Sequence, residues 1–438
     1  MSLSLRTIAI AAALIASTTQ LHAQPVLIGR VTHPVTDAQA NGDVRDPALS
    51  GDGRFLFFVS TANTLGPPAN GGLNLYRYDL SAATPAAESL ILAVSVLGNG
   101  NSFAPSVAGG GSRIAFESLA TNFGGSDSGQ ADVFLSEAFA LPQNEVGFDT
   151  TLVSRGLGGA APNSASKSPS ISENGQFIAY LSYASNVVSG DTNNAPDVFL
   201  ANVDTLGAPP ERISVDSNEV PSTGYSFPLS NRALSADGRF VVFNANASFD
   251  GATSTGDIFL RDRSAGTTTL VSRLINGTPF NSSSDFASIS PNARFIVFRS
   301  FASNGPSPSG SLIWLRDRTA NTLFSVPLPP GASSCEEPRV SNRADVIMQC
   351  NNASVGVFAQ AYLYRGSVGD VYRLSSTPGN GNGNGSSGTF MDLSSEGYHI
   401  AFDSAASNLV SGDTNSNTDT FLVVDNEILN RIFADGFE

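Results

Sequence analysis

Positive charge is scarce in this chain of 438 residues. It carries 23 Lys and Arg residues against 38 Asp and Glu, which gives a net charge of −15, and Lys167 is its single lysine. A protein that wraps DNA or RNA presents a basic surface to the phosphates. We therefore expect no nucleic-acid partner.

Histidine and cysteine are rarer still, with three and two residues. These counts exclude His-rich and Cys-rich metal sites. The sequence also lacks the Gly-x-Ser-x-Gly nucleophile elbow of α/β-hydrolases. We predict no catalytic residues, although a pair of glycosidase-type carboxylates stays open because its two members need not be close in sequence.

A long apolar run occurs once, from Ile8 to Ala16. It follows the positive charge of Arg6, turns polar, and ends in a small residue at Ala23, which is typical of a secretory signal peptide. The run is shorter than the roughly 20 apolar residues of a membrane-spanning helix. We therefore predict a signal peptide at residues 1–23, export to the periplasm or the medium, and no transmembrane segment.

What the chain has in quantity is internal repetition. One phrase occurs seven times: a small residue, an Asp-Gly or similar pair, an apolar stretch and a second small residue. Ser235–Ala245 is a clear copy. The copies end at residues 60, 118, 182, 245, 300, 350 and 404. This nearly regular spacing predicts seven structural units.

Each unit has the signals of four short strands. The Asp-Gly pair marks a tight turn into the second strand, which is apolar at consecutive positions, as in Phe240–Phe243. Both faces of that strand must be buried, as they are in a β-propeller blade. We predict an all-β fold: a single domain at residues 24–425, forming a seven-bladed β-propeller of four-stranded antiparallel blades, and a tail at residues 426–438.

The repeats resemble those of a known family. The block Leu234–Phe243, Leu-Ser-Ala-Asp-Gly-Arg-Phe-Val-Val-Phe, is similar to the repeats of TolB-like (PD40, WD40-like) β-propellers. The similarity covers nearly the whole mature chain and implies the propeller fold, but it is not specific for function. The ending Arg431–Glu438 also resembles short endings of secreted proteins of Gram-negative bacteria.

Two expectations concern how the ring is held together. The seventh unit lacks a fourth strand and Val26–Thr32 matches the fourth-strand pattern, so this N-terminal strand should complete the last blade and remove an open sheet edge. Cys335 and Cys350 lie equally far from the turn of the sixth hairpin. They should therefore form a disulfide across antiparallel strands in an oxidising compartment.

Two loops predict calcium sites, because oxygen-bearing side chains recur there at alternate positions and can turn toward one hard cation. The residues are Asp413, Asn415, Asn417 and Asp419 in the seventh unit, and Asp191, Asn193 and Asp197 in the third. The alternative is that they form turns, with Asp197 and Asp419 capping the starts of strands.

The connections predict where a partner could bind. In such a propeller the second connection of each blade and the links between blades share one face. Both kinds of connection are long here, so we call this face the long-loop face. Recurrent Asn residues in these loops, such as Asn186 and Asn408, are expected to shape turns. The first and third connections are short, and the Arg-Asp-Arg clusters at Arg261 and Arg316 should form solvated ion pairs on that opposite face.

These features favour a non-catalytic function. We predict an exported monomer that binds a protein or glycan through its long-loop face. The alternative is a propeller enzyme, a hydrolase or lyase with acidic residues in the central channel. Charged side chains that converge at the channel mouth would favour the enzyme, and a plugged channel would favour the binding protein.

Overall fold

A computed structural model describes most of the chain. The described residues are 26–31, 39–65, 72–81, 92–93, 98–124, 129–140, 146–252, 256–305, 312–352 and 358–425. The predicted signal peptide at residues 1–23 and the tail at residues 426–438 lie outside them. Within the described residues no helix is long and apolar enough to cross a membrane.

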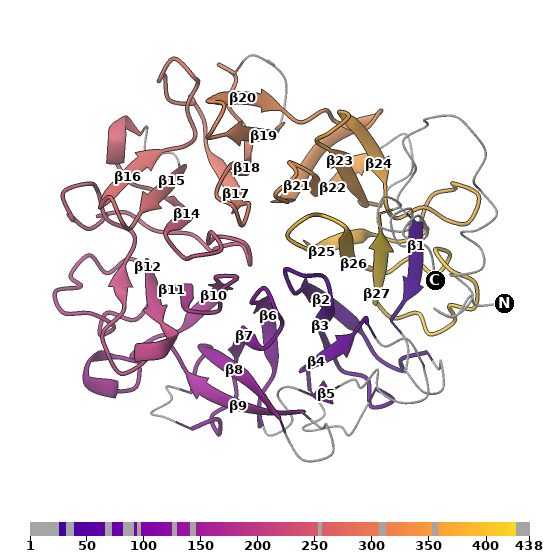
Figure 1. Cartoon of the computed structure of the whole chain (residues 1–438), viewed down its shortest axis with the longest axis horizontal. Helices are drawn as coiled ribbons and strands as arrows, with labels where there is room; N and C mark the ends of the chain where they lie inside the picture. Colours follow the sequence, from indigo (N-terminus) through magenta and orange to yellow (C-terminus); the bar gives the residue numbers. More distant parts are fainter. Residues whose placement is uncertain are drawn as a thin grey trace, which may run out of the picture.

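Seven antiparallel sheets surround a central axis as the blades of a propeller (Figure 1). They follow one another in chain order, and the strands of each blade run from the axis outward. Blades 1 to 3 consist of β2 (Val44–Leu49), β3 (Phe55–Ser60), β4 (Asn74–Asp79) and β5 (Leu92–Ala93); β6 (Ser102–Val107), β7 (Arg113–Ser118), β8 (Asp132–Ala140) and β9 (Val146–Leu152); and β10 (Ser166–Ile171), β11 (Phe177–Ser182), β12 (Asp197–Asn202) and β13 (Glu211–Arg212). Blades 4 and 5 consist of β14 (Phe240–Ala245), β15 (Asp257–Asp262) and β16 (Thr267–Leu270); and β17 (Ser284–Ile289), β18 (Phe295–Ser300), β19 (Leu312–Asp317) and β20 (Thr322–Ser325). Blades 6 and 7 consist of β21 (Ala332–Val340), β22 (Val346–Asn352), β23 (Gln360–Arg365) and β24 (Asp370–Arg373); and β25 (Ser387–Leu393), β26 (His399–Ser404), β27 (Asp419–Val424) and β1 (Val26–Arg30). The predicted seven-bladed propeller is confirmed.

The second strand of each blade explains why the repeat is apolar at consecutive positions. In β3 all six residues are buried. Successive side chains of a strand point to opposite faces of its sheet. Leu56 and Phe58 accordingly pack toward blade 7, and Phe57 packs toward blade 2. The core therefore lies between neighbouring blades, and each blade depends on both neighbours for its burial.

The Asp-Gly phrase forms a hydrogen-bonded turn between the first two strands. In blade 1, Ser50 Oγ donates to Asp52 Oδ1 at 2.5 Å and accepts from the backbone N–H of Phe55 at 2.9 Å. Gly53 has a φ of +73°, which favours glycine. We call the side of the molecule that carries these turns the turn face; it lies opposite the long-loop face.

The N-terminal strand closes the ring as predicted. β1 pairs antiparallel with β27, with Val26 opposite Val424 and Arg30 opposite Phe421. β1 is the outermost strand of blade 7 (Figure 1). The first and last described strands of the chain therefore meet in one sheet, and β27 is not an open edge.

Blade 6 contains the predicted disulfide. Cys335 on β21 lies directly opposite Cys350 on β22, their Cα atoms are 4.1 Å apart, and their sulfur atoms are bonded. Both side chains are buried in the core between blades 5 and 6.

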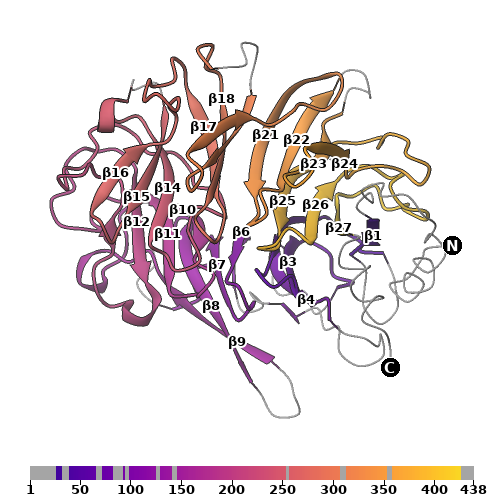
Figure 2. The same cartoon turned by 45° about the horizontal axis from the view of Figure 1, so that its top comes forward.

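Two blades depart from the regular repeat. Blade 4 has no innermost strand among its described residues, because residues 228–232 leave the sheet and only two isolated bridges remain, Ser226 to Ala245 and Leu234 to Val241. In blade 2, the β8–β9 hairpin extends beyond the body of the molecule (Figure 2). This hairpin is a third connection on the turn face, so the prediction that third connections are all short is wrong for blade 2.

Candidate functional site

The innermost strands share a bulge near the long-loop face. In six blades the pairing with the second strand shifts register at this point. A residue other than glycine has a positive φ there, between 46° and 57°, in five blades: Asp46, Ala104, Ser168, Phe286 and Glu337. A bulge re-aims side chains. In each of the six blades, two neighbouring residues at the bulge are partly exposed, on a strand that is otherwise largely buried.

These exposed pairs surround the axis at the long-loop end of the channel, and we call them the channel-mouth ring. Its members are Arg45, Asp46, Phe103, Ala104, Lys167, Ser168, Asp285, Phe286, Glu336, Glu337, Thr389 and Phe390. Six blades therefore contribute to the ring, which contains charged side chains of both signs and aromatic side chains. A ligand that approached along the axis would meet these residues first.

Three carboxyl groups gather on one side of the ring, from blades 7, 1 and 2. Burial raises the pKa of Asp46 to about 7; the N–H of Ala104, 2.6 Å from Asp46 Oδ2, opposes the rise, and the charges of Asp403 and Glu117 add to it. Burial also raises the pKa of Asp403 to about 6, although the N–H of Phe390 donates to its carboxylate. The pKa of Glu117 is raised by burial as well. Asp46 and Asp403 can therefore exchange protons near neutral pH.

On the other side of the ring, the carboxylates of Asp285 and Glu336 share one arginine. Arg299 on β18 bonds to Asp285 at 2.7 Å and to Glu336 at 2.9 Å. Its guanidinium carbon also lies 4.5 Å and 4.9 Å from the ring centroids of Phe286 and Phe301. A cation held by two carboxylates and two aromatic faces is fixed in place.

The turn-face end of the channel is plugged by blade 4. Residues 228–232 insert toward the axis, and Arg232 crosses it to reach blades 7 and 1. Its Nε and Nη2 lie 2.9 Å and 3.0 Å from the carboxylate oxygens of Asp392, and Nη2 also donates to the carbonyl oxygens of Leu49 and Leu393. Arg232 is 9% exposed and Asp392 1% exposed. The plug is therefore a buried ion pair whose polar groups are hydrogen-bonded.

Asn231 ties the same plug to three further blades. Ser106 and Ser170 donate to its backbone carbonyl at 2.9 Å and 3.3 Å, and Arg339 Nε donates to its side-chain oxygen at 2.8 Å. Sequence reasoning missed this plug, because Arg232 and Asp392 are 160 residues apart. The sequence did mark this position: four other copies of the repeat have proline where the fourth copy has Arg232, at positions 47, 105, 169 and 338.

Pairs of asparagines hold the long loops. In blade 3, Asn186 Oδ1 accepts from the N–H of Asn163 at 3.0 Å, and Asn163 Oδ1 accepts from the N–H of Ser185 at 2.9 Å. Related pairs join Asn41 to Asn63, Asn99 to Asn122, Asn281 to Asn304, and Asn384 to Asn408. The recurrent asparagines therefore shape turns, as expected, and in these five blades they also join the second connection to the link that enters the same blade.

An arginine lies among the predicted calcium ligands of blade 7. Arg30 Nη1 is 3.1 Å from Asp413 Oδ1 and 3.4 Å from Asp419 Oδ2. Asn415 donates its amide to a backbone carbonyl and accepts from the N–H of Asn417. Burial raises the pKa of Asp419 to about 7, against the charge of Arg30. The guanidinium group takes the position that a cation would need.

Blade 3 repeats this arrangement. Arg212 lies 3.3 Å from Asp191 and 3.7 Å from Asp197, and the amide of Asn193 donates to Asp197 at 3.1 Å. As they stand, these donors do not fit a calcium ion. In the part of the chain that the structure describes, no group of three or more His, Cys, Asp or Glu side chains could hold a metal. The calcium sites predicted from the sequence stay untested, and the two arginines lead us to expect none in the wild-type protein.

Aspartates at the start of the third strands bond to serines just beyond the ends of the fourth strands. Ser154 Oγ donates to Asp132 Oδ1 at 2.8 Å, and Ser272 Oγ donates to Asp257 Oδ1 at 2.7 Å. All four side chains are buried. This geometry supports a structural role for these aspartates, which join the start of the third strand to the segment after the fourth strand.

The Arg-Asp-Arg clusters are less solvated than expected. Arg261 is 3% exposed and pairs with Glu219. Burial lowers the pKa of Arg316 to about 10. The prediction of solvated arginines is wrong here because both side chains lie under neighbouring loops. The central Asp262 does form an exposed pair, 2.7 Å from Arg239.

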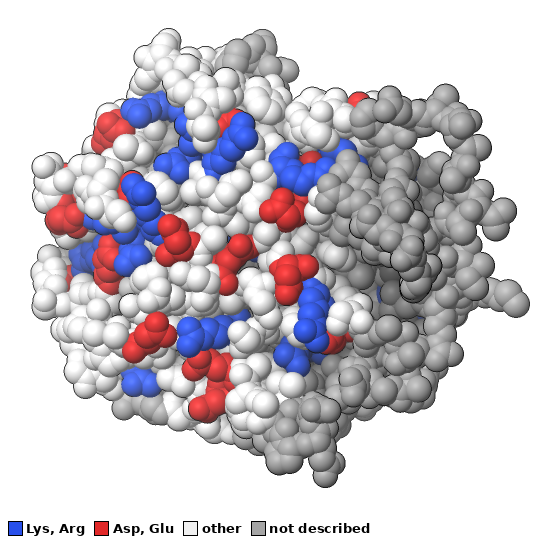
Figure 3. All heavy atoms as spheres, viewed as in Figure 1, with Lys and Arg blue, Asp and Glu red and all other residues white. Residues whose placement is uncertain are grey.

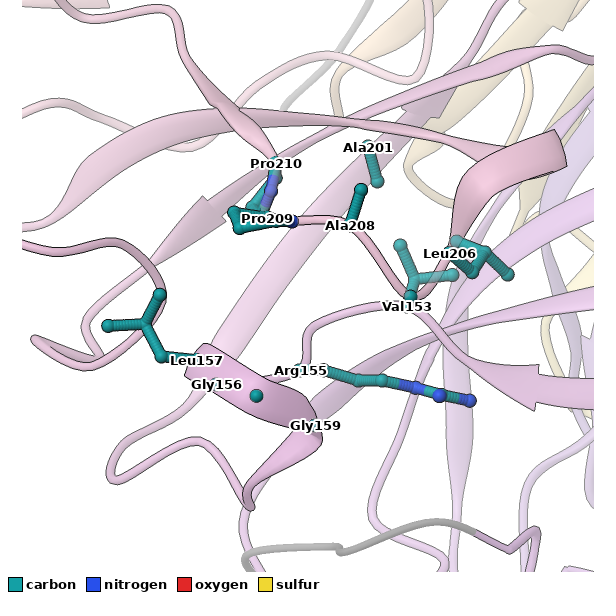
Figure 4. Close-up of a pocket in the computed structure, with 12 residues that line it drawn as sticks. Val153, Arg155, Gly156, Leu157, Gly159, Ala201, Leu206, Ala208, Pro209 and Pro210 are labelled. Atoms are coloured by element: carbon teal, nitrogen blue, oxygen red, sulfur yellow. The ribbon is translucent and has the colours of Figure 1, made fainter.

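Two hollows open on blade 3. One lies between Leu157–Gly159 and the loop before β13, with Leu157 and Pro209 toward one end and Leu206 toward the other (Figure 4). Its volume of about 40 Å³ suits a few water molecules. The second hollow, of about 190 Å³, opens on the long-loop face between Asn163, Tyr183 and Asp191.

Opposite charges alternate over the face of the molecule shown in Figure 3. On the described part of that face, no extended area carries one sign of charge. A partner of this face would therefore not be selected by net charge alone.

Comparisons with known proteins show the fold. No family model and none of the curated proteins matches the chain. Its structure is similar to an oligogalacturonate lyase from Vibrio parahaemolyticus, with a TM-score of 0.53 and 11% identity over 92% of this chain and 97% of the lyase. It is also similar to the β-propeller domain of the trilobed protease from Pyrococcus furiosus, with a TM-score of 0.52 and 9% identity over 88% of this chain and 95% of that domain.

The shared feature is the β-propeller fold. The protease domain has an open velcro topology, whereas β1 completes blade 7 in this chain. TolB from Acinetobacter baumannii also matches, with a TM-score of 0.40 and 13% identity over 88% of this chain and 79% of TolB. The neighbours thus include enzymes as well as TolB proteins.

Proposed function

We propose that the protein is an exported binding scaffold whose partner docks on the long-loop face at the channel-mouth ring. The observation that carries this proposal is the plug. Because Arg232 and Asp392 occupy the turn-face end of the channel, a partner would approach the ring from the long-loop face. The asparagine pairs hold the surrounding loops, and a preorganised surface loses less entropy on binding.

The partner that we propose is a protein or a glycan, bound by a monomer of this chain. Export to the periplasm or the medium is supported by the disulfide between Cys335 and Cys350, since such bonds persist in oxidising compartments. The predicted signal peptide would supply the route.

A pull-down from the producing cell's envelope and medium tests this proposal. The bait is the mature chain, compared with a ring variant that combines Lys167→Ala and Phe390→Ala, two exposed positions. The matched control combines Arg54→Ala and Arg239→Ala, which are exposed on the turn face. We expect wild type and control to capture the same partner and the ring variant to lose it. A partner that the ring variant retains would contradict the site.

A propeller enzyme is the second candidate function. The raised pKa values of Asp46 and Asp403 favour it, because carboxyls that transfer protons commonly have pKa values near the working pH. Incubation with polysaccharides, oligogalacturonate included, should then release new chain ends by hydrolysis or elimination. Asp46→Asn and Asp403→Asn should each abolish that release. Equal turnover by these variants would rule out the carboxyls as the source of activity.

A further inference from the structure

The larger hollow on blade 3 is the candidate for a small ligand site. The link before β10 and the second connection of the blade enclose it, and its volume is about 190 Å³. It is lined chiefly by Asn163, Ser164, Tyr183, Ser185, Asp191 and Asn194. Drug-sized ligands occupy pockets of roughly 300–1,000 Å³. This hollow therefore suits a single ring-sized unit, with the rest of a longer ligand in solvent.

Tyr183 supplies an uncovered aromatic face at this hollow. It is 48% exposed, although it directly follows the buried end of β11. The same position is occupied by Leu119 in blade 2 and by Phe301 in blade 5. Tyrosine adds to the apolar ring a hydroxyl that can donate and accept hydrogen bonds. Blade 3 thus combines an aromatic platform with a polar hollow.

The charges at this hollow disfavour ions as ligands. Arg212 Nη2 lies 3.3 Å behind Asp191 Oδ1, and the two side chains are 9% and 4% exposed. The guanidinium, which also lies 3.7 Å from Asp197, offsets part of the negative charge here and weakens the attraction for a cation. None of the lining side chains is basic, so an anion would find no opposite charge among them.

The hollow also offers neutral hydrogen-bonding groups. Asp191 Oδ1 is not one of them, because it is buried and faces Arg212 Nη2 at 3.3 Å. Ser164 and Asn194 add neutral donors and acceptors at the rim. An aromatic face beside neutral hydrogen-bonding groups matches a sugar ring, which has an apolar face and hydroxyls at its edge.

We propose that this hollow binds one neutral sugar unit of a glycan, with Tyr183 stacked on the ring and Ser164 and Asn194 hydrogen-bonded to its hydroxyls. The inference deepens the proposed function and rests on it, because the hollow lies on the long-loop face. It names a glycan, rather than a protein, as the partner.

Isothermal titration calorimetry with neutral pentasaccharides tests the proposal. The probes are cellopentaose, maltopentaose and xylopentaose, and trigalacturonate is the charged control. We expect at least one neutral probe to bind and trigalacturonate to bind at least tenfold more weakly. Tyr183→Ala should weaken binding roughly tenfold, the effect of a lost aromatic contact. Tyr183→Phe should retain most of the affinity, and the matched control Leu119→Ala should leave it unchanged.

Three results would overturn the sugar site: binding of none of the neutral probes, full affinity in Tyr183→Ala, or an equal loss in Leu119→Ala. Thermal melts of each variant establish that it is folded. A negative result can be assigned to one of the two proposals, because the pull-down tests the channel-mouth ring and the titration tests the hollow. A partner captured through the ring without any sugar binding leaves the proposed function standing and removes the sugar site. Sugar binding at Tyr183 with a partner that the ring variant retains removes the ring instead.

Discussion

At the residue scale, the channel depends on a few polar side chains that are buried in pairs. Arg232 reaches Asp392 and two backbone carbonyls, so its charge and most of its donors are satisfied. A buried ion pair of this kind gives little net stability over apolar packing. Removing one partner, however, leaves an uncompensated charge out of water.

Arg232→Ala should lower the free energy of unfolding by about 3–5 kcal/mol, because the buried charge of Asp392 would keep only the N–H of Leu49 as a partner. Urea unfolding measures the change. Adding Asp392→Ala to this variant should cost less than the sum of the two single changes, since the pair acts as a unit. Additive effects, or a loss below about 1 kcal/mol for the single variant, would show that the plug is not a coupled pair.

The raised pKa of Asp46 makes stability depend on pH. Its folded-state pKa of about 7 lies above the unfolded value, which is about 3.9. The stability that the protonated group contributes is complete below the unfolded pKa and is lost as the pH rises through the folded pKa. Asp46→Asn cannot ionise and should reduce the fall in unfolding free energy between about pH 4 and pH 7.

Asp262→Asn is the control for this pH dependence. The hydrogen bond from Arg239 lowers the pKa of Asp262, so its contribution is lost toward acid rather than in the neutral window. Chemical denaturation across this range compares the two variants. An Asp46→Asn protein with the wild-type slope would contradict the raised pKa.

At the scale of strands and loops, features with a recurring sequence pattern could be predicted, and features without such a pattern could not. The consecutive apolar residues of Phe240–Phe243 require burial on both faces, so the blade could be predicted from the sequence. The pairing of β1 with β27 followed from a strand pattern that one unit lacked. The channel-mouth bulges could not be predicted, because residues as different as Asp46, Ala104 and Phe286 adopt the same positive φ. The candidate site was therefore predicted only as a face.

The disulfide is the first prediction at this scale. Mass spectrometry of the unreduced protein after alkylation should find neither Cys335 nor Cys350 modified. Cys335→Ala with Cys350→Ala should lower the free energy of unfolding by about 3 kcal/mol, the chain-entropy value for a loop of this length. Reduction of the wild type provides the comparison without a change in sequence. Two alkylated thiols in the native protein would reject the bond.

Arginine side chains lie in the two loops where the sequence predicts calcium. Because Arg30 and Arg212 already pair with the carboxylates, we expect millimolar calcium and EDTA to leave the wild-type melting temperature unchanged. The double variant Arg30→Gln, Arg212→Gln should gain a calcium-dependent rise in melting temperature, since a ligand of the folded state stabilises it. A rise in the wild type that Asp413→Ala with Asp191→Ala removes would instead establish the calcium sites.

At the scale of the whole molecule, stability depends on closure of the ring. Each blade buries its faces against two neighbours, and β1 gives β27 its outer partner. The core residues of blade 7 pack against those of blade 1. Loss of the closing strand should therefore affect more than one blade.

Deleting residues 24–33 should lower the melting temperature strongly and promote aggregation, because β27 would become an exposed edge. Deleting residues 426–438 is the control and should have a smaller effect. Differential scanning calorimetry and light scattering measure the two outcomes. An unchanged melting temperature after the first deletion would show that β1 is dispensable for closure.

The number of blades has a mechanical consequence. Seven is odd, so across the axis each blade faces a boundary between two others, and blade 4 faces the boundary between blades 7 and 1 (Figure 1). Arg232 contacts both of those blades, through Asp392 and Leu49. A pulling force applied to the two ends of the chain would peel β1 from β27 first. The load would then reach blades 7 and 1, which an arginine from the middle of the chain still holds together.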